Sequence, residues 1–351
     1  MKVLLVSPLP PPSGGIATWT KEVVEFFGER KDDVTIRVLN TALTGKRFKI
    51  VSNTRSILDE VHRTMTILKE LKRMLRVESF DVMHINSSGA QFGMHRDALI
   101  AKTAKKHGIP VVLQFRCNVK DQAEYNKISR SGFRKLVKRI DRILVLNGES
   151  LIYVKERSNK PIDIIPNFTV MPVLEGYKTI NKNLSNAVFV GQVRRDKGID
   201  EIIETAQHFD KILFHLYGTV YAEYKNVSLP CNVILHGNTD KNGVREALDR
   251  ADVFILPSYT EGFSNALVEA MARGVPCIAT NVGANSEMLM MGCGVCVPSR
   301  NSTALSQALK SIMAKDVRQE YSKKALQRCK ELYTKEHVCG MLVKEWKARG
   351  R

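Results

Sequence analysis

Short apolar runs alternate with segments of helical periodicity along nearly the whole chain. A strand followed by a helix and then by another strand favours a parallel sheet with helices on both faces. The alternation lapses once, around residues 167–186, where the sequence is polar and has no period, and it then resumes. The runs predicted as strands are Lys2–Ser7, Val34–Leu39, Asp81–Ile85, Pro110–Phe115, Arg142–Leu146 and Ile162–Ile165 before the lapse, and Ala187–Gly191, Lys211–Tyr217, Asn232–Leu235, Asp252–Leu256 and Pro276–Ala279 after it.

The two alternations predict an α/β protein with two doubly wound, Rossmann-like domains that face each other across a central cleft. A length of 351 residues agrees with this, because a single hydrophobic core stops growing at about 250–300 residues. We expect an N-terminal domain over residues 1–170, a linker over 168–186 and a C-terminal domain over 186–335. A helix over residues 336–351 is expected to cross back to the first domain.

The composition is that of a soluble globular protein, with 44% hydrophobic and 26% charged residues. No segment has about 18 uninterrupted apolar residues, and the first residues lack the pattern of a signal peptide. The seven scattered cysteines favour reduced thiols in a cytoplasmic protein over a disulfide framework. Cys293 and Cys296 have the spacing of a zinc motif, but no second pair of ligands follows, so we predict two small buried residues.

The net charge of +18 is uneven, with +12 in residues 1–175 and +6 in residues 176–351. Two basic segments, Thr54–Val77 and Lys127–Arg142, each contain an apolar stripe at helical spacing. Either the stripes pack on the sheet and the charges are solvated, or one or both surfaces rest on the anionic cytoplasmic face of a membrane. Nucleic acid is not favoured as a partner, because no aromatic-studded sheet or recognition motif is present. The stripes are Ile57, Leu58, Val61, Met65, Leu68, Leu71 and Leu75 in the first segment and Phe133, Leu136, Val137 and Ile140 in the second.

Residues 252–276 read as a strand, a glycine turn and the start of a helix. Glu261 lies in the turn and Glu269 follows eight positions later. If the helix begins near Ser264, the free amides of its first turn point out of the N-terminus, where an anion binds well. The stretch therefore predicts a phosphate-binding site flanked by two carboxylates. The free amides expected are those of Ser264, Asn265, Ala266 and Leu267.

Ligands of doubly wound sheets bind beyond the carboxyl ends of the strands. In the predicted pattern Gly14 and Gly15 lie at such an end, as do the loops after Val190 and after Leu256. The dinucleotide fingerprint GxGxxG is absent from the first of these loops, which counts against a nicotinamide cofactor.

The order of the motifs resembles that of one family. A Gly-Gly loop is followed by Gly191-Gln-Val-Arg-Arg-Asp-Lys-Gly198, by Glu261-Gly-Phe-Ser-Asn-Ala-Leu-Val-Glu269, and by Val282-Gly-Ala-Asn-Ser-Glu287. Over nearly the whole chain this order looks like the retaining, nucleotide-sugar-dependent glycosyltransferases of family 4, which have the GT-B fold. The pair of glutamates eight positions apart is its most specific part.

The resemblance implies a role for each motif. Glu269 binds the ribose hydroxyls of the nucleotide and the helix amides hold its diphosphate. Glu261 lies near the transferred sugar and Lys197 neutralises the leaving diphosphate. Asp-x-Asp occurs nowhere in the chain, so no metal or other cofactor is expected and side-chain cations take that role. The donor-binding residues implied are Gly14, Gly15, Gly218, Gly262, Phe263, Ser264, Asn265, Ala266, Leu267 and Glu269.

Two positions depart from the family pattern. Family members usually carry Gly-Arg where this chain has Gly191-Gln192, so Arg194 or Arg195 is expected to supply the second phosphate cation, with Arg194 preferred. Relatives often end the strand near 111–115 with a histidine that faces the donor, and Arg116 occupies that place here. The residues implied on the acceptor side are His95, Arg96, Arg116 and Asn118.

The resemblance thus implies a retaining glycosyltransferase that moves a hexose-type sugar from a nucleotide diphosphate sugar to a glycan acceptor. The acceptor is expected to be linked to a polyprenyl lipid, with the enzyme in peripheral contact with the cytoplasmic face of the inner membrane. Three alternatives stay open: a nucleotide-sugar epimerase, a phosphorylase, or a catalytically silent subunit of the same fold that binds a glycan or a partner enzyme.

Overall fold

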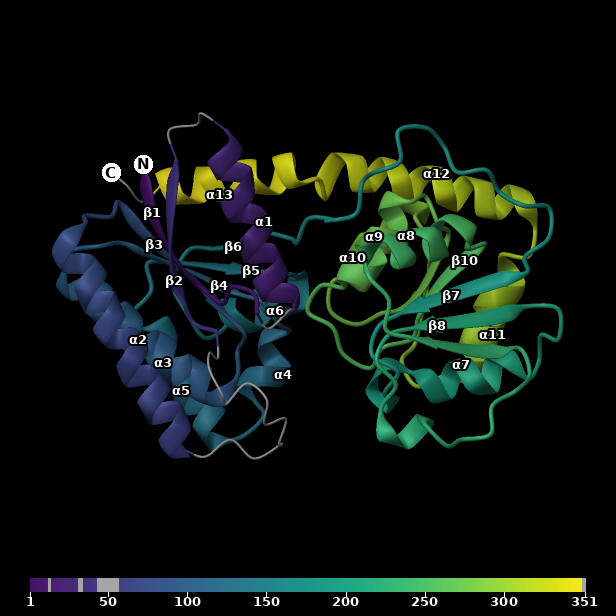
Figure 1. Cartoon of the computed structure of the whole chain (residues 1–351), viewed down its shortest axis with the longest axis horizontal. Coiled ribbons are helices and arrows are strands. Elements are labelled where there is room, and N and C mark those ends of the chain that lie inside the picture. The colour runs from purple at the N-terminus through teal and green to yellow at the C-terminus, as the bar shows by residue number, and fades with distance from the viewer. Residues whose placement is uncertain (12–13, 31–33, 43–56, 349–351) are drawn as a thin grey trace. The chain divides into compact units, whose positions relative to one another are not determined.

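The computed structural model describes residues 1–11, 14–30, 34–42 and 57–348. The chain divides into two compact units (Figure 1). Unit 1 comprises Met1–Pro166 together with Cys339–Arg351, and unit 2 comprises Asn167–Val338. The predicted helix start at residues 54–56 lies outside the described residues.

Unit 1 contains a six-stranded parallel sheet with the strand order β2-β1-β3-β4-β5-β6. Every residue of β3 and β4 is buried, as expected for strands that are covered on both faces. The sheet therefore forms the core of the unit. Its strands are β1 (Lys2–Ser7), β2 (Thr35–Asn40), β3 (Val82–Ser87), β4 (Val111–Phe115), β5 (Arg142–Val145) and β6 (Ile162–Ile164).

Seven helices accompany this sheet among the described residues. The basic segment Lys127–Arg142 begins with helix α5. The Asn126 side chain accepts a hydrogen bond from the Ser129 amide at 2.8 Å and so begins α5 at Lys127. The helices are α1 (Gly15–Glu29), α2 (Ile57–Val77), α3 (Gln91–Lys106), α4 (Val119–Ala123), α5 (Lys127–Val137), α6 (Gly148–Lys155) and α13 (Lys335–Lys347).

The two basic segments differ in how their apolar stripes are used. Phe133, Leu136, Val137 and Ile140 are all buried, as predicted for a stripe that packs on the sheet. On α2, by contrast, the side chains of Leu58, Val61 and Met65 are 79%, 55% and 63% exposed. Of the two alternatives, packing on the sheet does not hold for this part of α2, because the buried face of the helix runs through Glu60, Ile67 and Leu71.

Helix α13 contacts unit 1 through buried polar and aromatic groups. Trp346 Nε1 donates a hydrogen bond to His84 Nδ1 on β3 at 2.9 Å, and the Glu345 carboxylate pairs with Arg142. Burial lowers the pKa of His84 to about 3, and the nearby charge of Arg116 adds to that shift. His84 is therefore a neutral core residue.

No helix among the described residues is long and apolar enough to cross a membrane.

Unit 2 contains a second six-stranded parallel sheet, with the order β12-β11-β10-β7-β8-β9. Counted from β7, this is the order 3-2-1-4-5-6 of a Rossmann sheet, which reverses between β7 and β10. The strands are β7 (Asn186–Val190), β8 (Leu213–Tyr217), β9 (Val233–Gly237), β10 (Val253–Leu256), β11 (Cys277–Thr280) and β12 (Val295–Val297).

The segment taken as a linker from the sequence, residues 168–186, belongs to unit 2 and has no helix or strand before Asn186. It still contributes buried side chains, including Phe168, Ile180 and Leu184. Cys293 is buried as expected, but the prediction for Cys296 is wrong, because it is exposed on the edge strand β12. The helices of unit 2 are α7 (Ile199–Ala206), α8 (Lys241–Arg250), α9 (Asn265–Ala272), α10 (Asn285–Leu289), α11 (Ser302–Ser311) and α12 (Lys315–Leu332), with 3-10 turns η2 (Arg195–Lys197), η3 (Ala222–Tyr224) and η4 (Met290–Gly292).

Candidate functional site

The reversal of strand order in unit 2 determines where its ligand is expected. Strands β7 and β10 are neighbours in the sheet, yet their following helices α7 and α9 belong to the two halves of a doubly wound fold. The carboxyl edge beside this point of reversal is where such sheets bind ligands. The loops after these two strands are residues 191–198 and 257–264, which contain the lysine turn and the glutamate turn.

Close backbone contacts fasten these loops together. Gly198 has φ +75°, and a Cβ there would lie 2.1 Å from the carbonyl oxygen of Pro257. The Tyr259 amide donates to the Asp196 carbonyl at 2.9 Å, so the same two loops also share a hydrogen bond. Gly283, after β11, would likewise place a Cβ 2.0 Å from the Glu261 carbonyl. The turn that contains Glu261 is thus held by backbone on both sides.

Lys197 and Glu261 form an ion pair within this site. Their Nζ and Oε1 atoms are 2.7 Å apart, and their side chains are only 22% and 14% exposed. The sequence named both residues but did not anticipate the pairing, which spans 64 positions and depends on the strand order. A cation and a carboxylate are therefore already positioned together before any substrate binds.

The start of α9 is only partly as predicted. Ser264 is the N-cap, and its Oγ accepts a hydrogen bond from the Leu267 amide at 3.2 Å. The prediction of a free amide at Leu267 is therefore wrong, because the helix caps itself there. The amides of Asn265 and Ala266 have no acceptor among the described residues. These two donors are left for an anion.

Two other predicted donor-binding side chains belong to the core. Leu267 is fully buried, and Phe263 is buried with its ring edge-on to Tyr333 at 5.5 Å between centroids. Gly262 accepts a backbone hydrogen bond from the Ala284 amide at 3.2 Å. These three residues shape the turn around Glu261.

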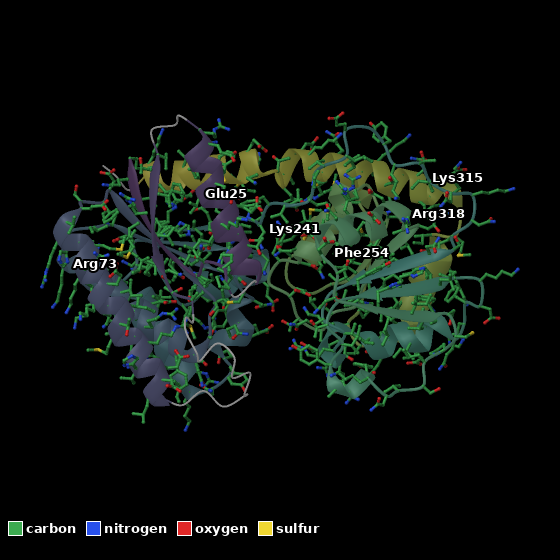
Figure 2. All side chains as sticks on the ribbon, in the orientation of Figure 1. Glu25, Arg73, Lys241, Phe254, Lys315 and Arg318 are labelled. Carbon is green, nitrogen blue, oxygen red and sulfur yellow. The ribbon has the colours of Figure 1, made fainter. Side chains whose placement is uncertain are left out.

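Glu269 lies one turn inside α9 with an unusual environment. Burial raises the pKa of its carboxyl group from 4.5 to about 7, and the positive charge of Lys241 partly opposes the shift. Lys241 begins α8 (Figure 2), and the sequence gave no sign that it would come near Glu269. The Glu269 carboxylate accepts no hydrogen bond from the residues that the structure describes. It is a desolvated acceptor that hydroxyl donors of a ligand would satisfy.

The arginines proposed to replace a missing phosphate cation both have carboxylate partners. Arg194 makes two hydrogen bonds to Asp196, with Nη2 at 2.6 Å from Oδ2, and its guanidinium lies 5.5 Å from the Tyr221 ring. Arg195 is exposed and donates to Asp200 at 3.0 Å. Both guanidinium groups are thus engaged by carboxylates, and Gln192 is exposed.

Gly218 and its neighbours form the carboxyl edge beside β7. A Cβ on Gly218 would lie 1.8 Å from the Gly191 carbonyl oxygen, so a glycine is required for the two strand ends to meet. Next to it, the rings of Tyr217 and His236 are stacked at 4.2 Å. His215 Nδ1 lies 3.0 Å from His236 Nε2. The stacking of these rings at the ends of β8 and β9 could not be anticipated from the sequence.

The predicted residues of unit 1 fall into two groups. Gly14 is the N-cap of α1 with an extended backbone, φ −177°, and a Cβ there would meet nothing within 4 Å. The conformation of Gly14 therefore does not demand glycine. Gly15 is exposed at the first position of α1, where no side chain caps the helix.

Three of the residues implied on the acceptor side instead make internal contacts of unit 1. His95 Nε2 lies 3.1 Å from the Ile128 carbonyl oxygen and packs between α3 and α5. Arg96 is 7% exposed and bonds the carboxylate of Asp97 at 2.9 Å. Asn118 is buried and donates to the Glu149 carboxylate at 2.7 Å. Arg96 is thus neither solvated nor open to a substrate, and Arg116 is left as the candidate of this group.

In the described parts of the chain, no three histidine, cysteine, aspartate or glutamate side chains gather as a metal site would require. The groups of this site are two helix amides and a lysine, which suit a diphosphate, and two carboxylates, which suit hydroxyl groups.

Comparison with known proteins gives two family matches. Residues 13–169 match the model described as Glycosyltransferase Family 4, and residues 176–329 match the model described as Glycosyl transferases group 1. TuaC of Bacillus subtilis (strain 168), which is named for teichuronic acid biosynthesis, is 26% identical over 234 residues. That match covers 63% of this chain and 59% of TuaC. A 41.2 kDa protein in the cps region of Klebsiella pneumoniae is 27% identical over 63% of this chain and 65% of its own length. The chain thus matches less than two thirds of the length of either relative.

Solved structures show the same fold. Sucrose-phosphate synthase from Thermosynechococcus elongatus superposes with a TM-score of 0.78 at 16% identity, covering 99% of each chain. HepE of Anabaena, solved in complex with UDP, gives a TM-score of 0.73 at 14% identity over 99% of this chain and 100% of HepE. Two Rossmann-type parallel sheets, one in each unit, agree with these likenesses. The chain belongs to the glycosyltransferases of family 4 and has the GT-B fold.

Proposed function

We propose that unit 2 binds a nucleotide diphosphate sugar and that the chain transfers this sugar to a glycan acceptor held by unit 1. The observation that carries the proposal is the Lys197–Glu261 pair, which lies at the switch point of a Rossmann sheet between fastened loops. The amides of Asn265 and Ala266 suit the diphosphate, and the Glu269 carboxylate suits the ribose hydroxyls. Structures of HepE with UDP and with UDP-glucose support a donor of this class.

The proposed transfer uses these groups, and its retention of configuration is carried over from the family resemblance. The bond between the anomeric carbon and the diphosphate oxygen breaks, and the acceptor hydroxyl oxygen bonds to that carbon on the same face, with retention. The hydroxyl proton leaves with the diphosphate. Lys197 stabilises the negative charge that develops on the diphosphate, and Glu261 stabilises the positive charge that develops at the sugar. Because Lys197 supplies the cation, we propose that the reaction needs no metal and that EDTA leaves the rate unchanged.

Transfer and retention are tested with purified protein and a panel of UDP, GDP, ADP and CDP sugars. Sugar release from one donor by the wild type is expected, with loss in Lys197→Met and in Glu261→Gln. The anomeric configuration of the product, read by NMR, should match that of the donor. A product of inverted configuration would contradict the retaining mechanism.

A catalytically silent subunit is the second candidate, and the exposed Gln192 together with the Arg194–Asp196 pairing favours it. Such a protein would bind the nucleotide tightly and turn over no donor. An epimerase of the same fold would instead release a changed nucleotide sugar or a free sugar without any acceptor. The same panel, analysed for products with and without acceptor, separates these cases.

We further propose that the acceptor is linked to a polyprenyl lipid in cell-surface polysaccharide synthesis, as the names of TuaC and of the cps-region protein suggest. The enzyme would then work in the cytoplasm, at the inner membrane.

The outer face of α2 supports this placement. Leu58, Val61 and Met65 are exposed there. Toward the end of the helix, near Arg73 (Figure 2), the exposed side chains of Lys69, Lys72 and Arg76 continue the same face. An exposed apolar stripe beside cations is typical of helices that lie on anionic membranes.

Membrane contact is tested by sedimentation with vesicles that contain phosphatidylglycerol, at low salt. The triple variant Leu58→Ser, Val61→Ser, Met65→Ser should lose most of the binding of the wild type. Val227→Ser in unit 2 removes a side chain of similar exposure, 46%, and should bind as the wild type does. Equal sedimentation of the triple variant and the wild type would exclude α2 as the contact.

A further inference from the structure

The surroundings of the Arg116 guanidinium differ from those of a structural arginine. It directly follows β4 in unit 1, and its guanidinium stacks on the ring of Trp19 in α1, 3.9 Å from the ring centroid. Its Nη1 atom is buried and has no hydrogen-bond partner. No carboxylate of the described residues pairs with Arg116.

Other buried or half-buried arginines of the chain have acceptors for their guanidinium groups, although Nη1 of Arg318, like that of Arg116, has no partner. Arg96 bonds Asp97, and Arg142 pairs with Asp163 and with Glu345. Arg318 on α12 (Figure 2) donates to the carbonyl oxygens of residues 181, 182 and 312 at 3.1 Å. These contacts are what a structural arginine requires, since a buried cation without acceptors destabilises the fold. Arg116 lacks them.

The groups that face Arg116 are neutral. His84 on β3 is uncharged in the core, and Trp19 presents the face of its ring. Burial lowers the pKa of Arg116 to about 9, which still leaves the guanidinium charged at neutral pH. An anion brought to this guanidinium would relieve an unfavourable state of the free protein.

The place of Arg116 in the sheet agrees with a ligand site. β4 pairs with β3, and Arg116 follows its carboxyl end, which is the edge where doubly wound sheets bind ligands. Arg116 as a residue is partly exposed, although its Nη1 atom is buried, so a ligand can approach it. A guanidinium presents paired N–H donors that match a carboxylate or a phosphate in a bidentate contact.

We propose that Arg116 is a specificity-determining residue that binds an anionic oxygen group, a carboxylate or a phosphate, on the acceptor. The proposal rests on the proposed function, because it assigns unit 1 an acceptor and specifies that this acceptor is acidic. Trp19 holds the guanidinium in place, and the missing protein acceptor is supplied by the substrate. Neutral sugars would bind unit 1 more weakly than acidic ones.

Stability gives the first test, since a structural arginine and a ligand-binding arginine respond oppositely to removal. Arg116→Met keeps packing on Trp19 and removes the unpaired charge, so its melting temperature should equal or exceed that of the wild type by about 2–4 °C. Arg96→Met is the matched control, and it should lower the melting temperature because it leaves Asp97 buried without its partner. A fall in Arg116→Met as large as that in Arg96→Met would overturn the proposal.

Binding gives the second test. The full chain is titrated with D-glucuronate, D-glucose 6-phosphate and D-glucose, with tryptophan emission as the readout, because one of the two tryptophans touches Arg116. Saturable changes are expected with one or both acids and not with glucose, at least tenfold weaker in Arg116→Met and partly kept in Arg116→Lys. Which acid binds separates a sugar carboxylate from a phosphate. Equal responses of the wild type and Arg116→Met, or a response to neither acid, would contradict the proposal.

UDP binding to Arg116→Met keeps this test distinct from the donor-site proposal. If the variant binds UDP as the wild type does while neither protein binds an acid, only the role of Arg116 fails. If neither protein binds any nucleoside diphosphate, the donor site itself is wrong.

Discussion

The carboxyl edges of the two sheets are built differently. In unit 2, glycines allow loops to meet backbone to backbone, and the charged groups Lys197 and Glu261 are already paired. In unit 1, the corresponding edge carries an uncapped α1 and the unsatisfied guanidinium of Arg116. A site assembled from backbone can serve a substrate part that never varies, such as a diphosphate. A site that depends on one side chain can change its specificity with one substitution.

The largest effect is expected at the paired charges of unit 2. Lys197→Met and Glu261→Gln should each lower kcat about 10²–10³-fold, as removal of one charge-stabilising group does in other enzymes. Steady-state assay of sugar transfer measures this. Arg195→Met removes an exposed cation two residues away and should change kcat little. A comparable loss in Arg195→Met would shift the catalytic cation away from Lys197.

The close backbone contact between the two loops of unit 2 is tested at Gly198. In Gly198→Ala the new Cβ meets the Pro257 carbonyl at 2.1 Å in a left-handed conformation, so the free energy of unfolding should fall by about 2–4 kcal/mol. Denaturant unfolding followed by circular dichroism gives the value. Gly176→Ala, where nothing lies within 4 Å, serves as the control and should stay within about 0.5 kcal/mol of the wild type.

Glu269 predicts a pH dependence. Its folded pKa of about 7 lies above the ordinary value of 4.5, so between these values the folded state holds the extra proton and stability from this group falls as pH rises. In the proposed donor site the deprotonated carboxylate accepts the ribose hydroxyls, so UDP affinity should increase through pH 7, by up to about tenfold per pH unit on the acid side. Calorimetric titration at several pH values tests this. An equal pH dependence in Glu269→Gln would assign it to another group.

The smallest effect concerns the core of unit 1. Trp346→Phe removes the donor to His84 Nδ1 and leaves a buried acceptor unsatisfied, which costs about 1–3 kcal/mol of stability. Because the change lies outside unit 2, UDP affinity should not change. A loss of UDP affinity in the folded variant would show that the core of unit 1 influences the nucleotide site proposed in unit 2.

The alternation of strands and helices predicted both sheets, because buried parallel strands are short continuous apolar runs that residue type reveals. The lysine and glutamate turns were likewise visible as motifs. The Lys197–Glu261 pair was not, since it depends on β7 and β10 becoming neighbours. Ser264 capping of Leu267 and the carboxylate partners of Arg194 and Arg96 depend on side-chain rotamers. The exposure of Leu58, Val61 and Met65 depends on which side of α2 meets the core. The period of apolar residues alone does not identify that side.

The most direct measurement is thermal unfolding in the presence of UDP, GDP, ADP and CDP. A ligand that binds the folded state stabilises it by RT ln(1 + [L]/Kd), about 2.7 kcal/mol at one hundred times Kd. One of the four should raise the melting temperature of the wild type, with a smaller rise in Glu269→Gln. Identical melting curves with and without all four nucleotides would contradict a nucleotide-sugar site in unit 2.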